Sequence, residues 1–271
     1  AGRSADVPAD ADPQQKAFER WVMDFRTSAR AAGIDEATLN VAFADVRYLP
    51  RVVELDRAQP EFTRPVWNYL DSAVSPQHVA LGQDKWLQFR AEIDAAAARY
   101  GVAPAILVAI WGVESNYGSN FGSIPTVDAL ATLGFEGRRE DWAIGQLLAA
   151  LRILQKGDLE RSAMMGSWAG AMGQTQFLPS VFLGYAVDAD GDGRRDIWGS
   201  MADVMASTAN FLARSGWQAD QPWGVEVRLP PRFDVGRADV EARQASSLWA
   251  AEGVQTIDGA PLPQFAEATV L

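Results

Sequence analysis

The chain contains no cysteine and only one histidine, His78. Without cysteine there is no disulfide, no thiolate metal site, no cysteine nucleophile and no cysteine-borne lipid anchor within this chain. A single histidine argues against a histidine-based catalytic triad and against a zinc cluster. Both exported and cytosolic proteins can lack cysteine, so the redox compartment stays open on this point.

Long apolar runs and basic charge are also scarce. The longest apolar run, residues 102–113, is shorter than the ~20 residues that a bilayer-spanning helix needs. The chain starts at Ala1 without a signal-like apolar segment, so we expect that any targeting peptide has been removed or left out. Lys and Arg number 24 against 35 Asp and Glu, which gives a formal net charge of −11. This balance argues against a nucleic-acid partner and against adhesion to anionic lipid.

Apolar residues are plentiful and are spaced as in helices. They make up 48% of the 271 positions, which is ample for a packed core. Residues 1–15 lack apolar periodicity and predict a flexible tail. Spacings of three and four then predict helices over 18–33, 36–46, 63–72, 76–100, 102–113, 141–155 and 200–215. After residue 217, "WGVEVRLP", "GVQTI" and "ATVL" are short β-rich runs. We therefore predict a mainly α (α+β) fold, with a helical body over 16–217 and a small β-rich unit over 218–271.

The stretch "AIWGVESNYGSN" places Glu114 at the end of the apolar helix. Desolvation and the negative end of the helix dipole both disfavour the ionised carboxylate and raise its pKa. A raised pKa suits a general acid that works near neutral pH. The alternative is an ordinary surface glutamate at a helix end, but the flanking glycines and Tyr117 are typical of a cleft wall.

A second stretch, "GSWAGAMGQTQFLPS" at 166–180, combines glycines with neutral polar groups and aromatic rings. Glycines allow a ligand to approach the backbone closely. Hydroxyl and amide side chains with flat rings suit a sugar, which offers hydroxyls and apolar ring faces. A phosphate loop would require a lysine after the glycines, and none follows. A tight packing loop is the remaining alternative.

A third stretch, "DADGDGRRDIW", matches the first half of an EF-hand calcium loop through Asp188, Asp190, Asp192 and the glycine that follows. The twelfth position of that loop would be glutamate, but this sequence has Gly199. Asp203 is a candidate substitute ligand. The alternatives are a solvated turn for the three aspartates and a helix-capping role for Asp203.

These three stretches, in this order and spacing, resemble the MltB-type lytic murein transglycosylases of glycoside hydrolase family 103, from about residue 16 onward. The resemblance implies a lysozyme-like helical core over 101–217 with an EF-hand-like loop at 188–199. It also implies an all-helical domain over 16–100 and a small β domain over 218–271. The β domain is expected to be incomplete, since the family's C-terminal Tyr-Asn motif has no counterpart before Leu271.

The resemblance also assigns residues. It makes Glu114 the catalytic acid/base and implies that substrate is bound by Ser167, Gln176, Tyr117, Arg138, Arg139, Asn210 and Phe211, the last standing where the family usually has tyrosine. It implies that structural calcium is held by Asp188, Asp190, Asp192, Arg194 and Asp203. No cofactor is expected for catalysis.

We therefore predict a periplasmic enzyme, soluble or attached to the outer membrane through a segment absent from this chain. It would cleave the β-1,4 bond between N-acetylmuramic acid and N-acetylglucosamine in peptidoglycan and form 1,6-anhydromuramoyl ends. Ordinary glycosidases use two carboxylates; here only Glu114 has a convincing setting, whereas Asp128 and Asp141 do not. The expected partners are glycan strands, together with proteins of cell-wall synthesis or remodelling. A hydrolytic lysozyme-type muramidase and a non-catalytic glycan-binding module are the alternatives.

Overall fold

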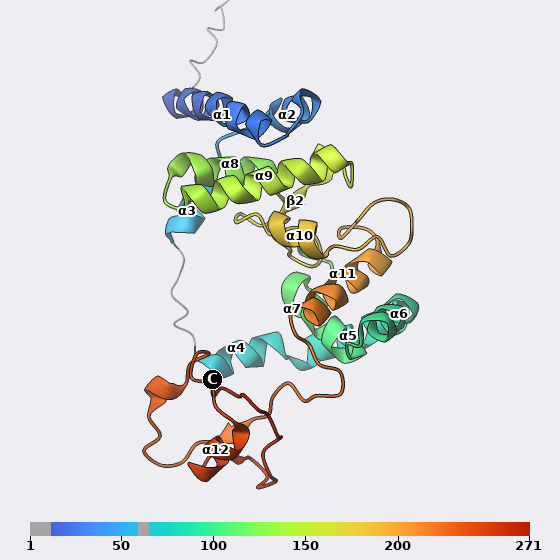
Figure 1. The fold of residues 1–271 in the computed structure, drawn as a ribbon, viewed down its shortest axis with the longest axis vertical. Coiled ribbons are helices and arrows are strands. Elements are labelled where there is room, and N and C mark those ends of the chain that lie inside the picture. Colours follow the sequence, from blue (N-terminus) through green and yellow to red (C-terminus); the bar gives the residue numbers. More distant parts are fainter. Residues whose placement is uncertain (1–11, 59–64) are drawn as a thin grey trace, which may run out of the picture. The chain divides into compact units, whose positions relative to one another are not determined.

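The first helical cluster combines helices from the start of the helical body with helices between residues 126 and 185. The structure, a computed structural model, describes residues 12–58 and 65–271. Figure 1 shows α1 (Pro13–Ala31) and α2 (Glu36–Phe43) lying over α8 (Thr126–Glu136) and α9 (Glu140–Lys156). Two shorter helices, α3 (Pro50–Arg57) and α10 (Pro179–Tyr185), pack against α8 and α9 respectively. The apolar spacing of α1 has its physical basis here, because the buried face of α1 supplies Phe18, Val22, Phe25 and Ala29 to this core.

The second helical cluster carries the helix that ends at Glu114. It consists of α5 (Pro76–Gln88), α6 (Arg90–Tyr100), α7 (Pro104–Ser115) and α11 (Met201–Arg214). Its core includes Ile93, Leu107, Val204 and Met205. The single helix predicted over 76–100 is wrong, because the chain breaks at Phe89 (φ −113°, ψ 29°) into α5 and α6. The Phe89 ring packs edge-on against Trp111 at 5.8 Å, so tertiary packing accounts for the break that apolar spacing did not reveal.

Between α3 and α5 lies α4 (Val66–Ala73), which buries none of its side chains. The helix predicted over 63–72 corresponds to α4, which begins at Val66. The first two predicted positions, 63 and 64, lie outside the described part of the chain. The predicted tail over 1–15 also lies mostly outside it, and α1 already begins at Pro13. A two-stranded antiparallel ladder pairs β1 (Ile124–Pro125) with β2 (Met165–Gly166).

Residues up to Gln218 form one compact unit and residues from Ala219 onward form another. The helical segment 16–100, expected as a separate domain, belongs to the first unit together with residues 101–217. The second unit contains β3 (Val227–Arg228) paired with β4 (Gln255–Thr256), a 3-10 turn η2 (Val235–Arg237), α12 (Ser246–Ala251) and a small core of Trp249, Val254 and Val270. It contains less strand than predicted, since "ATVL" contributes only an isolated bridge from Ala268 to Gln244.

Within the described residues, no single helix has both the length and the apolar composition needed to cross a membrane. The pair α6 and α7 meets the criterion only when the two are taken together, and they are bent from one another by 116°.

Candidate active site

The site is built at the C-terminal end of α7. Asn116 follows the helix in the left-handed conformation (φ 47°), and its N–H donates to the Gly112 carbonyl at 3.0 Å. The N–H of Tyr117 donates to the Trp111 carbonyl at 3.2 Å. The bond from Asn116 to Gly112 is that of an αL cap, and both bonds satisfy carbonyls that the helix end leaves free. Glu114 therefore stands in the last turn of a firmly closed helix.

Glu114 is exposed to solvent and has no hydrogen bond or ion pair with any residue in the described part of the chain. Desolvation by the surrounding protein nevertheless raises the pKa of the Glu114 carboxyl group. The negative end of the α7 dipole acts in the same direction. The desolvation predicted from the sequence is thus only partial in the free protein, because the Glu114 side chain is open to solvent. A ligand over Glu114 would exclude water and raise the pKa further.

A cavity of about 340 Å³ opens at Glu114. It is lined by α4, by the start of α5, and by the end of α7 with the turn that follows: Tyr69, Ser72, Ala73, His78, Gly112, Val113, Glu114, Asn116 and Asn120. Glu114 is the only carboxylate in this lining among the described residues. Apart from Glu114, sequence reasoning had selected none of these residues for binding, because the segments that carry them are brought together only by the fold.

Tyr117, predicted as an aromatic wall of the cleft, is instead buried at 8% exposure. Its ring lies edge-on to Trp111 at 5.6 Å, and its hydroxyl donates to the backbone carbonyl of His78 at 3.0 Å. Gly82 and Gly112 face the ring so closely that a methyl group on either would come within 2.6 Å of a Tyr117 atom. Tyr117 therefore joins α5 to α7 and does not line the cavity.

The Gly-rich stretch forms a turn after β2. Ser167 Oγ accepts the N–H groups of Ala169 at 3.3 Å and Ala171 at 3.1 Å. A methyl group on Gly166 would lie 1.9 Å from the Ala171 carbonyl oxygen, so only glycine fits there. The Ser167 hydroxyl uses its two acceptor positions within the turn and keeps its own hydrogen for another partner. Substrate binding by Ser167 therefore stays a prediction, in which this hydroxyl hydrogen would be donated to the glycan.

Gln176 has the left-handed conformation (φ 54°), and its Nε2 donates to the carbonyls of Phe121 at 3.0 Å and Gly173 at 2.9 Å. Its Oε1 has no hydrogen-bond donor among the described residues, so a glycan contact through that oxygen stays a prediction.

Gln174, two positions earlier, ties this stretch to α7. Its Oε1 accepts from Trp111 Nε1 at 2.8 Å and its Nε2 donates to the Trp198 carbonyl at 2.7 Å. Ser115 Oγ donates to the Gln174 carbonyl at 2.8 Å. The polar character of this stretch is visible in the sequence, but the role of Gln174 is not, because its partners lie far away along the chain.

Arg138 and Arg139 hold a carboxylate of the protein itself. Asp56, at the end of α3 and 6% exposed, receives Arg138 Nε at 2.8 Å and Arg139 Nη2 at 2.9 Å. The hydrogen bonds from Arg138 hold the pKa of Asp56 below its usual value against desolvation. The Arg139 guanidinium also stacks on Trp142 at 4.5 Å. Binding of an external carboxylate by these arginines stays a prediction, and such a ligand would share them with Asp56.

Asn210 and Phe211 lie on α11. Asn210 Nδ2 donates to the Tyr185 carbonyl at 2.9 Å. The Phe211 ring packs 5.1 Å from Tyr185 and 5.7 Å from Phe177 in the Gly-rich stretch. Both residues support α10 and the turn that precedes it, and their predicted glycan contacts stay predictions.

The aspartate loop gathers four carboxylates. Oxygens of Asp188, Asp190, Asp192 and Asp203 all lie within 4.8 Å of one another. Ligands on opposite sides of calcium are separated by about 4.6–5.2 Å, since each lies 2.3–2.6 Å from the ion. Burial raises the pKa of Asp203, although three backbone N–H groups donate to its carboxylate and act to lower that pKa. The carboxylate set therefore fits a hard divalent cation.

Two further predictions concern this loop. Ser200 Oγ accepts the Asp203 N–H at 3.3 Å at the start of α11, which is half of the capping arrangement considered as the alternative. Both roles coexist, because Asp203 reaches the loop through its carboxylate. Arg194 donates its backbone N–H to Asp192 Oδ1 at 2.8 Å, and its role as a metal ligand stays a prediction.

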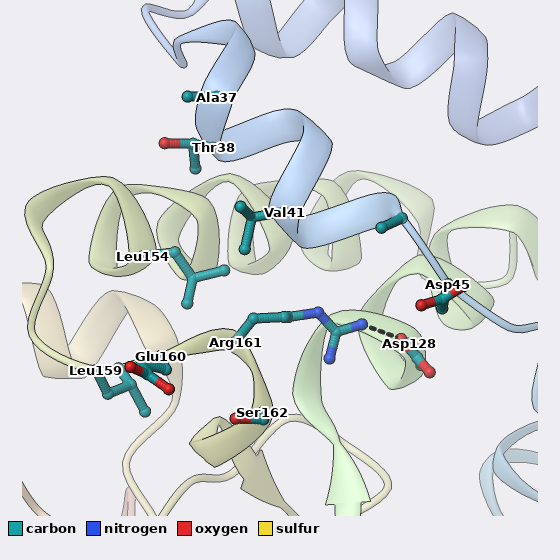
Figure 2. Close-up of a pocket in the computed structure, with 11 residues that line it drawn as sticks. Ala37, Thr38, Val41, Asp45, Asp128, Leu154, Leu159, Glu160, Arg161 and Ser162 are labelled. Carbon is teal, nitrogen blue, oxygen red and sulfur yellow. Dashed lines mark hydrogen bonds and ion pairs between the residues drawn. The ribbon is translucent and has the colours of Figure 1, made fainter.

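A second cavity, of about 660 Å³, is lined by residues of α2, α8, α9 and the segment 159–162 (Figure 2). None of its lining residues belongs to the Glu114 cavity. Arg161 reaches across it to Asp128 and also donates to the Ala42 carbonyl at 3.0 Å. Burial raises the pKa of Asp128, and the positive charge of Arg161 opposes that rise. Asp128 is thus committed to an ion pair outside the Glu114 cavity.

Fold and site together define a mainly helical, lysozyme-like protein with a single-carboxylate cavity and an EF-hand-like loop. The chain belongs to the family described as Transglycosylase SLT domain, which matches residues 17–271. The membrane-bound lytic murein transglycosylase B of Escherichia coli is 33% identical over 195 residues, covering 68% of this chain and 54% of that protein. The chain thus spans about half the length of this curated relative.

The chain is also similar to solved structures of lytic transglycosylases. SltB3 from Pseudomonas aeruginosa, in complex with NAG-NAM-pentapeptide, is 53% identical with a TM-score of 0.87, covering 94% of this chain and 69% of SltB3. The lytic transglycosylase Slt35 of Escherichia coli, in complex with calcium, is 28% identical with a TM-score of 0.79, covering 94% of this chain and 79% of Slt35. The predicted family and the predicted lysozyme-like, mainly helical fold class are confirmed.

Proposed function

We propose that this chain is a lytic transglycosylase. It cleaves the β-1,4 bond between N-acetylmuramic acid and N-acetylglucosamine in peptidoglycan and leaves 1,6-anhydromuramoyl ends. Family membership supports the reaction class, and the glycan–peptide ligand of SltB3 supports the substrate class. The observation that carries the proposal is the cavity in which Glu114 is the only carboxylate among the described residues.

One carboxylate suffices when the nucleophile belongs to the substrate. In its protonated form, which the raised pKa favours, Glu114 gives its proton to the glycosidic oxygen while the bond from that oxygen to muramoyl C1 breaks. The muramoyl C6 oxygen then bonds to C1, and its proton passes to the Glu114 carboxylate. Glu114 ends protonated as it began, and no water is consumed. The tethered hydroxyl also has an effective-molarity advantage that can reach about 7–11 kcal/mol in well-oriented cases.

A hydrolytic muramidase would use the same acid but would need a second carboxylate to stabilise C1 or to activate water. Asp128 lines the other cavity, paired with Arg161, so it is not placed for that role. A non-catalytic glycan-binding module would not need a carboxyl group with a raised pKa at the centre of its cavity.

The decisive experiment is mass spectrometry of the products from purified peptidoglycan, before and after borohydride treatment. Intramolecular attack gives muramoyl ends that lack one water relative to the hydrolysed product and that resist reduction. Digests dominated by reducible muramic acid would contradict the proposal. Loss of turbidity alone cannot distinguish the two reactions, because both cut the same bond.

The proposed partner is the peptidoglycan glycan strand, which places the activity in the periplasm. The names of the relatives include both a membrane-bound and a soluble enzyme, so attachment differs among them. Partner proteins of cell-wall synthesis or remodelling stay a prediction of the resemblance.

We further propose that the aspartate loop binds calcium, as the calcium complex of Slt35 and the carboxylate geometry support. The ion would be held by Asp188, Asp190, Asp192 and Asp203 and would stabilise the loop before α11. Its role is structural, because all four carboxylates lie outside the lining of the Glu114 cavity.

The protein should therefore melt at a higher temperature with excess calcium than with a chelator. Ligand binding at one hundred times Kd contributes about 2.7 kcal/mol to the free energy of unfolding. The paired substitution Asp188→Asn and Asp192→Asn removes two charges and keeps one acceptor oxygen at each position, although Asp188 uses both of its oxygens to accept backbone N–H groups. It should abolish the rise. Equal melting curves of the unsubstituted protein with calcium and with chelator would refute the site.

A further inference from the structure

We propose that His78, the only histidine of the chain, is a positioning residue for the Glu114 site. Its imidazole joins the end of α4 to the turn that ends α7, and residues of both elements line the cavity. The inference rests on the proposed function, because it concerns the cleavage that Glu114 carries out.

On the α7 side, His78 Nε2 lies 2.9 Å from Asn116 Oδ1. Asn116 also donates through Nδ2 to Ser119 Oγ at 2.9 Å, and Ser119 Oγ donates to the Asn116 carbonyl at 2.8 Å. Asn116 is the left-handed residue that closes α7, two positions after Glu114. The imidazole therefore acts on the turn that fixes the direction of the last helical turn.

On the α4 side, His78 Nδ1 lies 2.8 Å from the Ala73 carbonyl oxygen. This oxygen can only accept, so Nδ1 carries a proton. None of the side chains of α4 is buried, although Tyr69, Ser72 and Ala73 line the Glu114 cavity. A wall without buried anchors depends on polar contacts for its position, and His78 provides one at the last turn of α4.

The bridge can persist in either protonation state of the ring. A doubly protonated imidazole donates to Ala73 and to Asn116 Oδ1. A singly protonated ring donates to Ala73 and accepts from Asn116 if the amide of Asn116 is turned over. In that orientation Asn116 Oδ1 faces Ser119, whose hydroxyl can donate to it by giving up its bond to the Asn116 carbonyl. The proposed role is therefore alignment of the two elements and not transfer of a proton.

The backbone of His78 is held separately from its ring. Its carbonyl accepts the Tyr117 hydroxyl at 3.0 Å, and its N–H donates to Ser75 Oγ at 3.2 Å at the start of α5. The ring also contacts the Tyr117 ring at 4.9 Å. His78→Phe should keep these backbone bonds and the ring contact while losing both polar contacts of the imidazole. His78→Gln can still donate one hydrogen bond and accept another.

The test compares the unsubstituted protein with His78→Phe and His78→Gln on glycan strands. A displacement of about 1 Å at a reacting centre can cost about a hundredfold in rate, so we expect His78→Phe to lower kcat by roughly ten- to a hundredfold. KM should change less than kcat, and His78→Gln should recover most of the loss. Equal losses in both variants would show a packing role and overturn the proposal, as would an unchanged kcat in His78→Phe.

Asn116→Gly provides the matched background, because glycine keeps the left-handed conformation and removes the amide. If the bridge acts through Asn116, His78→Phe should cost much less kcat in this background than in the unsubstituted protein. Full additivity of the two losses would contradict the proposal.

Hydrogen exchange measures the bridge without relying on turnover. His78→Phe should speed exchange of amides in α4 and leave those in the interior of α7 unchanged. Unchanged exchange in α4 would contradict the bridge. If His78→Phe speeds exchange in α4 but the unsubstituted protein does not cleave glycan strands, the proposed function is contradicted. The bridge would then have no role in catalysis.

Discussion

At the scale of single residues, Glu114 combines access with partial desolvation. Its carboxyl group must be reached by a glycan, and it must also be protonated before reaction. A salt bridge would hold it ionised, and among the described residues it has none. The end of an apolar helix meets both needs, because neighbouring apolar atoms desolvate the group while the helix end leaves one side open.

Replacing Glu114 with glutamine removes the proton donor while nearly preserving its shape. General acid–base catalysis contributes typically 10²–10⁴-fold, so Glu114→Gln should lower kcat by about that factor. Binding of glycan strands, measured by calorimetry, should change little. Near-normal turnover by Glu114→Gln would exclude Glu114 as the acid.

The same substitution tests the raised pKa of Glu114 through stability. A pKa raised above the ordinary glutamate value of 4.5 means that the folded state holds the proton more tightly than the unfolded state. This contribution is complete below pH 4.5 and is lost as the pH rises through the folded-state pKa. Glu114→Gln should therefore melt at a slightly higher temperature than the unsubstituted protein at neutral pH, and the difference should shrink in acid. A constant difference across pH would contradict the raised pKa.

Gln174 and Gln176 should respond differently to truncation. Gln174 is buried, and Gln174→Ala leaves the Trp111 indole N–H without its acceptor, which costs about 1–3 kcal/mol of unfolding free energy. Gln176 is only half-buried, so Gln176→Ala should lower cleavage more than stability. Urea unfolding and initial rates measured on both variants would separate them. A larger stability loss for Gln176→Ala would reverse this assignment.

At the scale of elements, the joint between α5 and α7 sets where Glu114 stands. Gly82 and Gly112 let the two helices close on the Tyr117 ring, and the Tyr117 hydroxyl bonds to the α5 backbone. Gly82 and Tyr117 do not line the cavity, yet a shift of this joint would move the cavity wall that Gly112 and Glu114 belong to.

Gly112→Ala should consequently destabilise the protein by about 1–3 kcal/mol through overpacking against Tyr117. Gly145→Ala is the matched control, because Gly145 also lies inside a helix but its new methyl group would meet no atom within 4 Å. It should stabilise the protein by about 0.5–1 kcal/mol. Thermal melts would show opposite shifts, and a gain of similar size in both variants would mean that Tyr117 yields readily and that the joint is not overpacked.

At the scale of the whole molecule, the chain divides into two units of very different size. The second unit, from Ala219 onward, has a small core around Trp249 and no disulfide. Residues 218–226 are mostly exposed and lie between α11 and β3 without regular structure. Such segments are the preferred sites of proteolytic nicking.

Limited proteolysis with a nonspecific protease should first cut within 218–226. The first products should be fragments that end or begin there, as intact mass spectrometry would show. Calcium should leave this cut unaffected, since the aspartate loop belongs to the first unit. First cuts inside α7 or α11 would contradict this order.

The helical class, the placement of Glu114 at a helix end and the spacing of the aspartates can all be predicted from the sequence. These features are local: apolar periodicity defines helices, a cap follows a helix end, and alternate aspartates shape one loop. The family resemblance also followed from short contiguous motifs, since each motif carries its residues within a dozen positions.

Tertiary structure alone decided which side chains face the cavity. Tyr117 is turned into the joint because Gly82 and Gly112 leave room for its ring, whereas His78 and Ser72 reach Glu114 from helices far earlier in the chain. Asp56 captures Arg138 and Arg139 across more than eighty positions, and the break at Phe89 follows from its packing on Trp111. Such contacts depend on how helices pack, and a local pattern carries no record of the partner that will lie opposite.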